Sequence, residues 1–168
     1  MTNHHAAQVS ALLLFVILTV SLTPGFAIQP FTYQYAFITI TVTDYKITDP
    51  THATVYGSIT NNGWFTVRLL SADGDVSTGD GTELITGDLF GLPVNVAPGS
   101  SVPGQATLLG YYTLAEVKQM NIQAIHVHAE GTYCFPTWVG CVGPFTHTYD
   151  HTFTIQEVTA IARNYQAP

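Results

Sequence analysis

The chain has 168 residues, of which only 9% are charged, and eleven Asp and Glu against four Lys and Arg give a formal net charge of −7. So few basic residues cannot neutralise a run of phosphates, which excludes nucleic-acid binding and disfavours anionic membrane surfaces. An ordinary soluble domain is about 25% charged. The polar but uncharged surface expected here suits burial against neighbouring copies or a medium in which charge is a poor solubiliser. A small secreted domain with a polar, neutral surface is the alternative.

Residues 1–27 predict export. Residues 11–22 form an apolar run, and Pro24-Gly25 precedes a cleavage position after Ala27, which is the layout of a secretory signal peptide. The run is too short to span a bilayer comfortably. Because the stretch before it contains no Lys or Arg, an uncleaved N-terminal hydrophobic segment is the alternative, and only that segment would then contact a membrane. We therefore expect the protein outside the cell or at its surface.

An aromatic segment, residues 28–36, follows the predicted cleavage position. Its apolar residues fall on odd positions, whereas those of the next segment fall on even positions. The odd positions are Phe31, Tyr33, Tyr35 and Phe37. One strand cannot keep one face buried through this switch without a bulge, so a bulge or a strand buried on both faces is one interpretation. The other is a detachable donor strand that completes the sheet of a neighbouring subunit.

Residues 37–168 are expected to form one β domain. Val, Ile, Thr and Tyr recur there with a period of two between turn residues, which predicts antiparallel strands. The clearest strands lie over 53–60 and 64–70, and Asn61-Asn62-Gly63 between them predicts a hairpin turn. Residues 72–82, rich in Asp and Gly, are expected to form a loop.

The second half of the domain continues this pattern. Thr113 and Glu116 form a capping box, which predicts one short helix over 114–120. The remaining strands are expected over 84–90, 94–97, 106–111, 121–130 and 145–161. About seven to nine strands predict an all-β fold, a single antiparallel β-sandwich of jelly-roll or immunoglobulin-like type.

Cys134 and Cys141 are the two cysteines of the chain. An even count in an exported chain predicts one disulfide, which would close a short loop across the end of a hairpin. A pair of metal ligands is the alternative, although the CxxC spacing is missing.

Four histidines fall on the last two long strands: His126, His128, His147 and His151. If the two cysteines face each other directly, all four line one sheet face, close enough to share Zn²⁺ or Cu²⁺. The binary pattern gives another register, because Ile125 and Val127 mark a core face. The first two histidines then point outward with Asp150, and the other two point inward. Ile125-His126-Val127-His128 also resembles the His-x-His strand of copper-zinc superoxide dismutases and of the CHRD domain.

The predicted loop over 72–82 is a second candidate site. Asp73, Asp75 and Asp80 supply carboxylate oxygens in a Gly-rich stretch, and such loops bind Ca²⁺. The spacing differs from that of an EF-hand, so a solvated turn is the alternative. The sequence contains no GxSxG, HExxH or phosphate-binding loop, and we therefore expect no enzyme.

In overall style the chain resembles exported archaeal filament subunits, which are small β-sandwich proteins rich in Thr and Tyr and poor in charge. That resemblance implies polymerisation by donor-strand exchange and a role in attachment at the cell surface. The first hypothesis is therefore an exported structural subunit that forms a homopolymer: a filament, a pilus-like fibre or a surface layer. A secreted copper- or zinc-binding domain is the second hypothesis. A module that binds surface glycans through exposed aromatic residues is the third.

Overall fold

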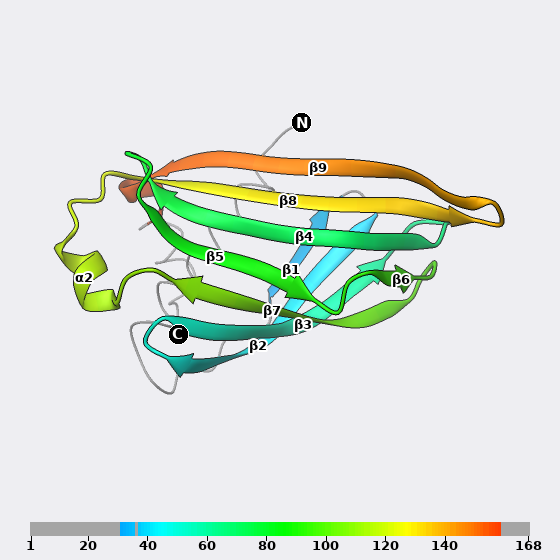
Figure 1. The fold of residues 1–168 in the computed structure, drawn as a ribbon, viewed down its shortest axis with the longest axis horizontal. Coiled ribbons are helices and arrows are strands. Elements are labelled where there is room, and N and C mark those ends of the chain that lie inside the picture. The colour runs from blue at the N-terminus through cyan, green and yellow to red at the C-terminus, as the bar shows by residue number, and fades with distance from the viewer. Residues whose placement is uncertain (1–30, 36, 159–168) are drawn as a thin grey trace.

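The computed structural model describes residues 31–35 and 37–158 (Figure 1). The described strands are β1 (Phe31–Tyr35), β2 (Ile38–Asp49), β3 (His52–Asn61), β4 (Val67–Thr78), β5 (Glu83–Phe90), β6 (Val94–Val96), β7 (Ser101–Gly110), β8 (Ala124–Thr137) and β9 (Gly140–Thr154). The helix α2 (Leu114–Gln119) joins β7 to β8. The predicted signal segment, residues 1–27, lies outside the described residues. Within the described residues, no helix is long and apolar enough to cross a membrane.

The strands form one antiparallel sheet. Their order is β1-β2-β3-β7-β5-β4-β8-β9, and β6 pairs with β4 beside this path. Strands β9, β8, β4 and β5 lie side by side in one layer, and the sheet bends through β7 into β3 and β2 (Figure 1). The all-β, antiparallel class is therefore confirmed. The two layers are consistent with the predicted all-β sandwich, and one continuous path of hydrogen-bonded strands joins them.

Two clusters of buried side chains hold the bent sheet together. The first lies on β4, β8, β9 and the helical turn after β9, and it contains Val76, Ile125, Val127, Phe153 and Val158. The second lies on β2, β3 and β7 and contains Val42, Val55 and Leu108. Ile85 packs against both clusters and so connects them. Full burial of a side chain of this size contributes roughly 1.5–3 kcal/mol, which explains why the apolar residues of these strands alternate.

The helix α2 begins where the sequence predicts it. The Oγ1 atom of Thr113 accepts a hydrogen bond from the backbone N–H of Glu116, and the Glu116 carboxylate accepts one from the N–H of Thr113 at 2.7 Å. These bonds satisfy N–H groups that the first helical turn leaves free. The bonds from Thr113 also lower the pKa of Glu116 below its ordinary value. The capping box and the short helix are therefore confirmed.

The hairpin predicted over 53–70 is wrong. Strand β3 lies between β2 and β7, whereas β4 lies between β5 and β8, so the two strands do not pair. The fully buried side chain of Asn61 donates hydrogen bonds to the carbonyl oxygens of Phe65 at 2.7 Å and of Val96 at 3.0 Å. A buried amide keeps its hydrogen-bond partners. These contacts lead the chain across to the other part of the sheet, and they outweigh the local turn preference.

Two segments predicted as loops are mostly strand. β4 continues to Thr78, so only residues 79–82 turn before β5 begins. β8 and β9 extend through residues 131–144 and meet in one long hairpin. β9 ends at Thr154, where a helical turn over 155–158 begins, seven residues before the predicted end at 161. In each case cross-strand pairing extends a strand beyond the range that apolar alternation alone indicates.

Candidate functional site

The β8–β9 hairpin holds its four histidines on two different faces. His126 lies opposite Thr152, and His128 lies opposite Asp150, whereas His147 lies opposite Gly131 and His151 opposite Val127. Residues directly opposite each other share a face, and neighbours along a strand do not. The predicted cluster of four histidines on one face is therefore wrong, and the register given by the binary pattern is right.

The positions of the two cysteines do not predict which residues of β8 and β9 face each other, because the pairing of the two strands shifts beside the cysteines. A bulge lies between Tyr133 and Phe135, and Cys141 pairs with Pro136 across the hairpin. The disulfide therefore joins Cys134 and Cys141 diagonally. An extra residue in one strand changes which residues face each other beyond it, and this breaks the step from cysteine position to histidine register.

On the outer face, two histidines converge on one carboxylate. The Nδ1 atom of His128 lies 2.7 Å from Oδ1 of Asp150, and Nε2 of His126 lies 3.4 Å from the same oxygen. His126 Nδ1 also lies 3.0 Å from the hydroxyl oxygen of Thr152. All three groups of the ion-pair cluster are partly exposed. The arrangement therefore favours a protonated imidazole beside an ionised carboxylate at the surface.

The protonation equilibria of this group follow from its contacts. The hydrogen bond to Asp150 raises the pKa of His128 against the opposing effect of partial burial, and the charges of Asp150, Asp75 and Glu130 act in the same direction. The bond from His128 lowers the pKa of Asp150. Asp75 is the residue opposite His128 on β4, so carboxylates flank this imidazole on both neighbouring strands.

On the inner face, the other two histidines belong to the packed interior. The imidazole of His151 lies 4.3 Å from the ring of Phe153 and 6.2 Å from that of Tyr149, measured between ring centroids. His147 is half-buried two residues before Tyr149 on the same side of β9. Aromatic packing accounts for the position of His151 without any metal ion.

The structure does not bring the predicted metal ligands together. In the part of the chain that it describes, no group of three or more His, Cys, Asp and Glu is arranged to hold a metal ion. Ligands on opposite faces of one hairpin cannot meet at one ion. In the described residues the four histidines therefore do not form the predicted copper or zinc centre.

The three aspartates predicted to hold Ca²⁺ lie in two different settings. Asp73 and Asp75 lie within strand β4, and Asp80 lies in the turn after it. There Asp80 accepts hydrogen bonds from the Thr78 hydroxyl and the N–H of Thr82, and these lower the pKa of Asp80. The role of Asp80 is to fix the β4–β5 turn. Calcium binding stays a prediction.

Register creates an acidic row that the sequence does not show. Asp73 lies directly opposite Asp88 on β5 and Glu130 on β8. Directly opposed like charges destabilise a sheet. No spacing in the sequence could have indicated this row, because its three members come from three strands whose pairing is set by the whole fold.

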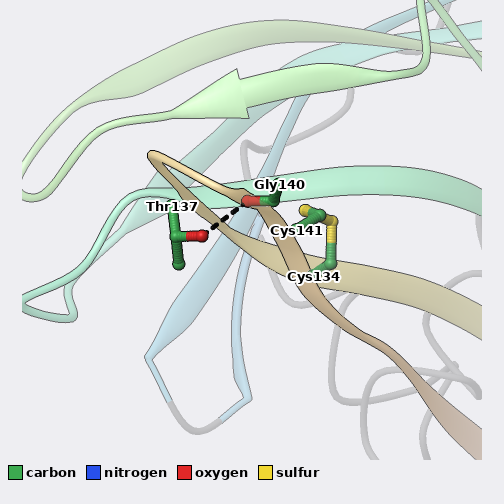
Figure 2. Close-up of a disulfide and its surroundings, with 4 residues drawn as sticks. All are labelled: Cys134, Thr137, Gly140 and Cys141. Atoms are coloured by element: carbon green, nitrogen blue, oxygen red, sulfur yellow. Dashed lines mark hydrogen bonds between the residues drawn. A yellow bond between two sulfur atoms is a disulfide. The ribbon is translucent and has the colours of Figure 1, made fainter.

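The predicted disulfide is confirmed. Cys134 and Cys141 are bonded, with their Cα atoms 5.7 Å apart (Figure 2). Beyond them, Thr137 pairs with Gly140, and the Thr137 hydroxyl donates a hydrogen bond to the Gly140 carbonyl at 2.9 Å (Figure 2). Disulfides persist in oxidising compartments, so the bond fits an extracellular environment.

The proposed donor segment forms its own strand. Phe31, Tyr33 and Tyr35 lie on β1, which pairs with β2 through the partners Val42, Ile40 and Ile38. The phase switch marks a chain reversal between two strands, and not a bulge within one. Phe37 lies in the turn after β1, and its ring contacts those of Tyr133 and Phe135 at 6.1 Å between centroids. Phe37 is therefore an anchor on β8 rather than part of the strand.

Among the strands that the structure describes, the main path of paired strands ends at β1 on one side and at β9 on the other, while β6 pairs only with β4. β1 has five residues and β9 has fifteen. Natural edge strands are commonly blunted by Lys, Pro or bulges. From residue 145 to 154, β9 contains no Lys, Arg or Pro. This edge is a long template for strand addition.

The comparisons with known proteins give no family. No protein family and no curated protein matches the sequence. Among solved structures, the chain is similar to the yeast GGA1 GAE domain, with a TM-score of 0.42 and 14% identity over 76% of this chain and 99% of that chain. A protein from Archaeoglobus fulgidus gives 0.40 and 12% over 67% and 96%. The ApaA protein from Bordetella pertussis gives 0.40 and 17% over 70% and 92%. Likeness of this size carries no function to this chain.

Proposed function

We propose that this protein is an exported structural subunit that polymerises at the cell surface by exchanging its N-terminal strand. In this fibre, β1 of one subunit leaves β2, and residues 28–35 pair with the edge of β9 in the next subunit. The observation that carries the proposal is the pair of strands at the two sides of the sheet: the short terminal strand β1 at one side, and at the other β9, which contains no Lys, Arg or Pro over residues 145–154.

The two edges differ, and this difference sets the kind of assembly. A contact between unlike surfaces is heterologous, and it produces open chains when its rotation does not close a ring. Each subunit would offer one donor strand and one acceptor edge. The proposed polymer is therefore a linear fibre, in which every internal subunit makes both contacts.

Backbone pairing supplies the affinity of the proposed contact. Five residues of β1 pair with β2 in the structure. The acceptor β9 is fifteen residues long, so it can accept a strand of that length. Main-chain hydrogen bonds supply affinity in strand addition. The small share of charged residues supports the same proposal, because uncharged faces can pack against copies without burying unpaired charges.

The cellular location and the type of β fold are part of the same proposal. The disulfide fits an oxidising compartment, and residues 1–27 have the layout of an export signal. We infer an extracellular or cell-surface protein without catalytic activity, built on a jelly-roll or immunoglobulin-like variant of the all-β fold, and acting in adhesion.

The first test removes the donor strand. Deletion of residues 28–35 should abolish fibres in negative-stain electron microscopy and leave a monomer by sedimentation, because no strand remains to exchange. Regular fibres from the deletion variant would overturn the proposal.

A second variant guards against misfolding of the first. Thr146→Lys with Thr148→Lys adds two cations to exposed positions of the edge strand β9, which should prevent fibres while leaving a cooperative unfolding transition. Ser101→Lys with Gln105→Lys is the matched control, because it adds the same charge to exposed positions of the central strand β7. Fibres from the β9 variant, or loss of fibres in both, would contradict edge pairing.

A further inference from the structure

The end of the molecule that carries the β8–β9 tip exposes large apolar side chains. Trp138 is 96% exposed, Trp64 is 89% exposed and Phe65 is 71% exposed. We call the whole set the aromatic end: Trp64, Phe65, Trp138, Val139, Val142 and Phe145. Exposed apolar patches of this kind commonly mark interaction sites.

Ring contacts join the two segments of the aromatic end. The ring of Phe65, from the connection between β3 and β4, lies 6.5 Å from that of Phe135 on β8. Phe135 in turn lies 5.7 Å from Phe145 on β9. The hairpin tip reaches the far end of the molecule, opposite α2 (Figure 1). The aromatic end therefore projects from the molecule, and a partner would have to surround it.

The stretches of chain near the aromatic end contain almost no charged residues. The stretches 37–43, 57–72, 89–105 and 131–149 contain no Asp, Glu or Lys and a single Arg, Arg68. Protein interfaces usually surround an apolar centre with a polar rim, whereas charges are costly in a hydrocarbon layer. An uncharged projection with exposed tryptophans matches a lipid bilayer better than it matches a protein surface, because Trp favours the boundary between headgroups and acyl chains.

Local hydrogen bonds prepare the tip for such an environment. Pairing between β8 and β9 continues to Thr137 and Gly140, so the connection contains only Trp138 and Val139. The Thr137 hydroxyl is bonded to the Gly140 carbonyl (Figure 2). Polar backbone groups must be satisfied internally where water is absent. The backbone groups that face each other across the hairpin are therefore paired, while the outward-facing groups of the edge strand β9 would meet headgroups and water at the boundary. The disulfide holds the tip in one shape.

Arg68, the single Arg of these stretches, lies at a distance from the tip that suits contact with lipid phosphates. Arg68 pairs in register with Cys134, four residues before Trp138. At about 3.3 Å per residue this places it about 13 Å behind the tip, near the depth of lipid phosphates when a segment inserts by about 5–10 Å. The acidic residues lie farther back, and a net charge of −7 disfavours anionic surfaces. The complementary surface is a zwitterionic one.

We propose that Trp138 and Val139, with Trp64 and Phe65 beside them, insert into the headgroup boundary of a zwitterionic lipid bilayer. This goes beyond the proposed polymerisation, because it uses the hairpin tip and neither sheet edge. It also adds a membrane contact to the one expected only from an uncleaved N-terminal segment. The tip would attach each subunit, or the end of a fibre, to a membrane.

The experiment uses the full chain with phosphatidylcholine vesicles. The two tryptophans of the chain both lie at the aromatic end, so Trp64→Phe and Trp138→Phe each leave one local reporter. We expect both reporters to shift to shorter wavelength and to be quenched by brominated phosphatidylcholine. Because only these positions report, binding through residues 1–27 alone would leave both reporters unquenched, and that result would overturn the proposal.

Binding strength supplies an independent readout. Trp138→Ala with Val139→Ser should lower the partition coefficient roughly tenfold or more, since the inserted apolar area is lost. Tyr111→Ser is the matched control, because Tyr111 is an exposed aromatic residue at the α2 end, and it should bind as the parent does. Equal binding by parent and tip variant would overturn the proposal.

Lipid charge and self-association complete the test. Replacing part of the phosphatidylcholine with phosphatidylserine should weaken binding, most at low salt, because the acidic body is repelled. Stronger binding to the anionic vesicles would overturn the zwitterionic assignment. Self-association without vesicles that the tip variant abolishes would show that a second copy, and not lipid, occupies the aromatic end. If the tip variant still forms fibres, polymerisation does not depend on the tip, and the two proposals can be judged separately.

Discussion

The two ends of the β8–β9 hairpin use the same pair of strands in opposite ways. At the base, one face is buried, with Phe153 only 2% exposed, and the other face carries His128 and Asp150. At the tip, Trp138 and Val139 are exposed, and no charged residue lies between 131 and 149. The base is therefore held by burial, whereas the tip is held by a covalent bond and local contacts.

This difference teaches that a long hairpin can separate stability from recognition. Apolar residues at the base are buried in the core, so they are not accessible to a partner. Those at the tip lie beyond the core and remain accessible, and the Cys134–Cys141 bond supplies the order that burial does not. Changes at the base should therefore affect global unfolding, while changes at the tip should act locally.

The largest effect is expected from the base. Phe153→Ala removes a buried ring from the cluster that also contains Val76 and Ile125, and it should lower the free energy of unfolding by about 3–5 kcal/mol. Urea unfolding followed by circular dichroism measures this loss. The matched change is Phe145→Ala on the same strand, where the ring is 41% exposed, and it should cost about 1 kcal/mol. Similar losses at the two positions would break the comparison.

An intermediate effect is expected from the disulfide. Cys134→Ala with Cys141→Ser should cost about 2 kcal/mol, since the bond closes a short loop and so constrains the unfolded chain only modestly. Ala suits the buried Cys134, and Ser suits the exposed Cys141.

Hydrogen exchange shows where the disulfide acts. Amides of residues 131–146 should exchange faster in the variant, while those of 125–127 at the base should keep their protection. A reductant should reproduce the change in the parent and have no effect on the variant. Equal loss of protection along the whole hairpin would contradict a local role.

The alternation of apolar residues along a strand predicts well which side chains face the core, but it predicts poorly which residues of two strands pair. The alternation around Ile125 and Val127 correctly predicts that His126 and His128 point away from the core, because burial of a face depends on neighbours in sequence. The cysteine argument predicted the other register and was wrong, since a bulge beside Cys134 shifts the pairing. A bulge of this kind leaves no signal in the spacing of the two cysteines.

The missed part of β4 has a physical reason as well. Asp73 and Asp75 alternate with small residues, and Gly74 in that series indicated a loop. In the structure a Cβ atom on Gly74 would lie 2.8 Å from the His128 carbonyl oxygen, so the glycine is required by close approach of β8. The capping box of α2, by contrast, is set by residues three apart in sequence, and it was predicted correctly.

The smallest effect is expected on the outer face of the base. The bond to Asp150 raises the pKa of His128 above its ordinary 6.5 and lowers the pKa of Asp150 below its ordinary 3.8. A raised histidine pKa stabilises the folded state fully below pH 6.5, and this contribution is lost as pH rises through the folded pKa. A lowered aspartate pKa contributes above pH 3.8, and this is lost as pH falls through the folded pKa. Both contributions are therefore present together between these two values.

Replacing the carboxylate tests this coupling directly. In Asp150→Asn, a nuclear magnetic resonance titration of the His128 imidazole should give a lower pKa than in the parent, because the main cause of the shift is gone. Asp75 on the neighbouring strand β4 and Glu130, two residues along β8, still raise the pKa of that imidazole, so part of the shift should remain and should shrink in high salt. Asp80→Asn, in the β4–β5 turn, is the control and should leave the pKa of His128 unchanged. An unchanged value in Asp150→Asn would mean that the acidic strand neighbours, and not the hydrogen bond, set the charge of the outer face. The stability change should be small in either case, since both groups are partly exposed and water screens their attraction.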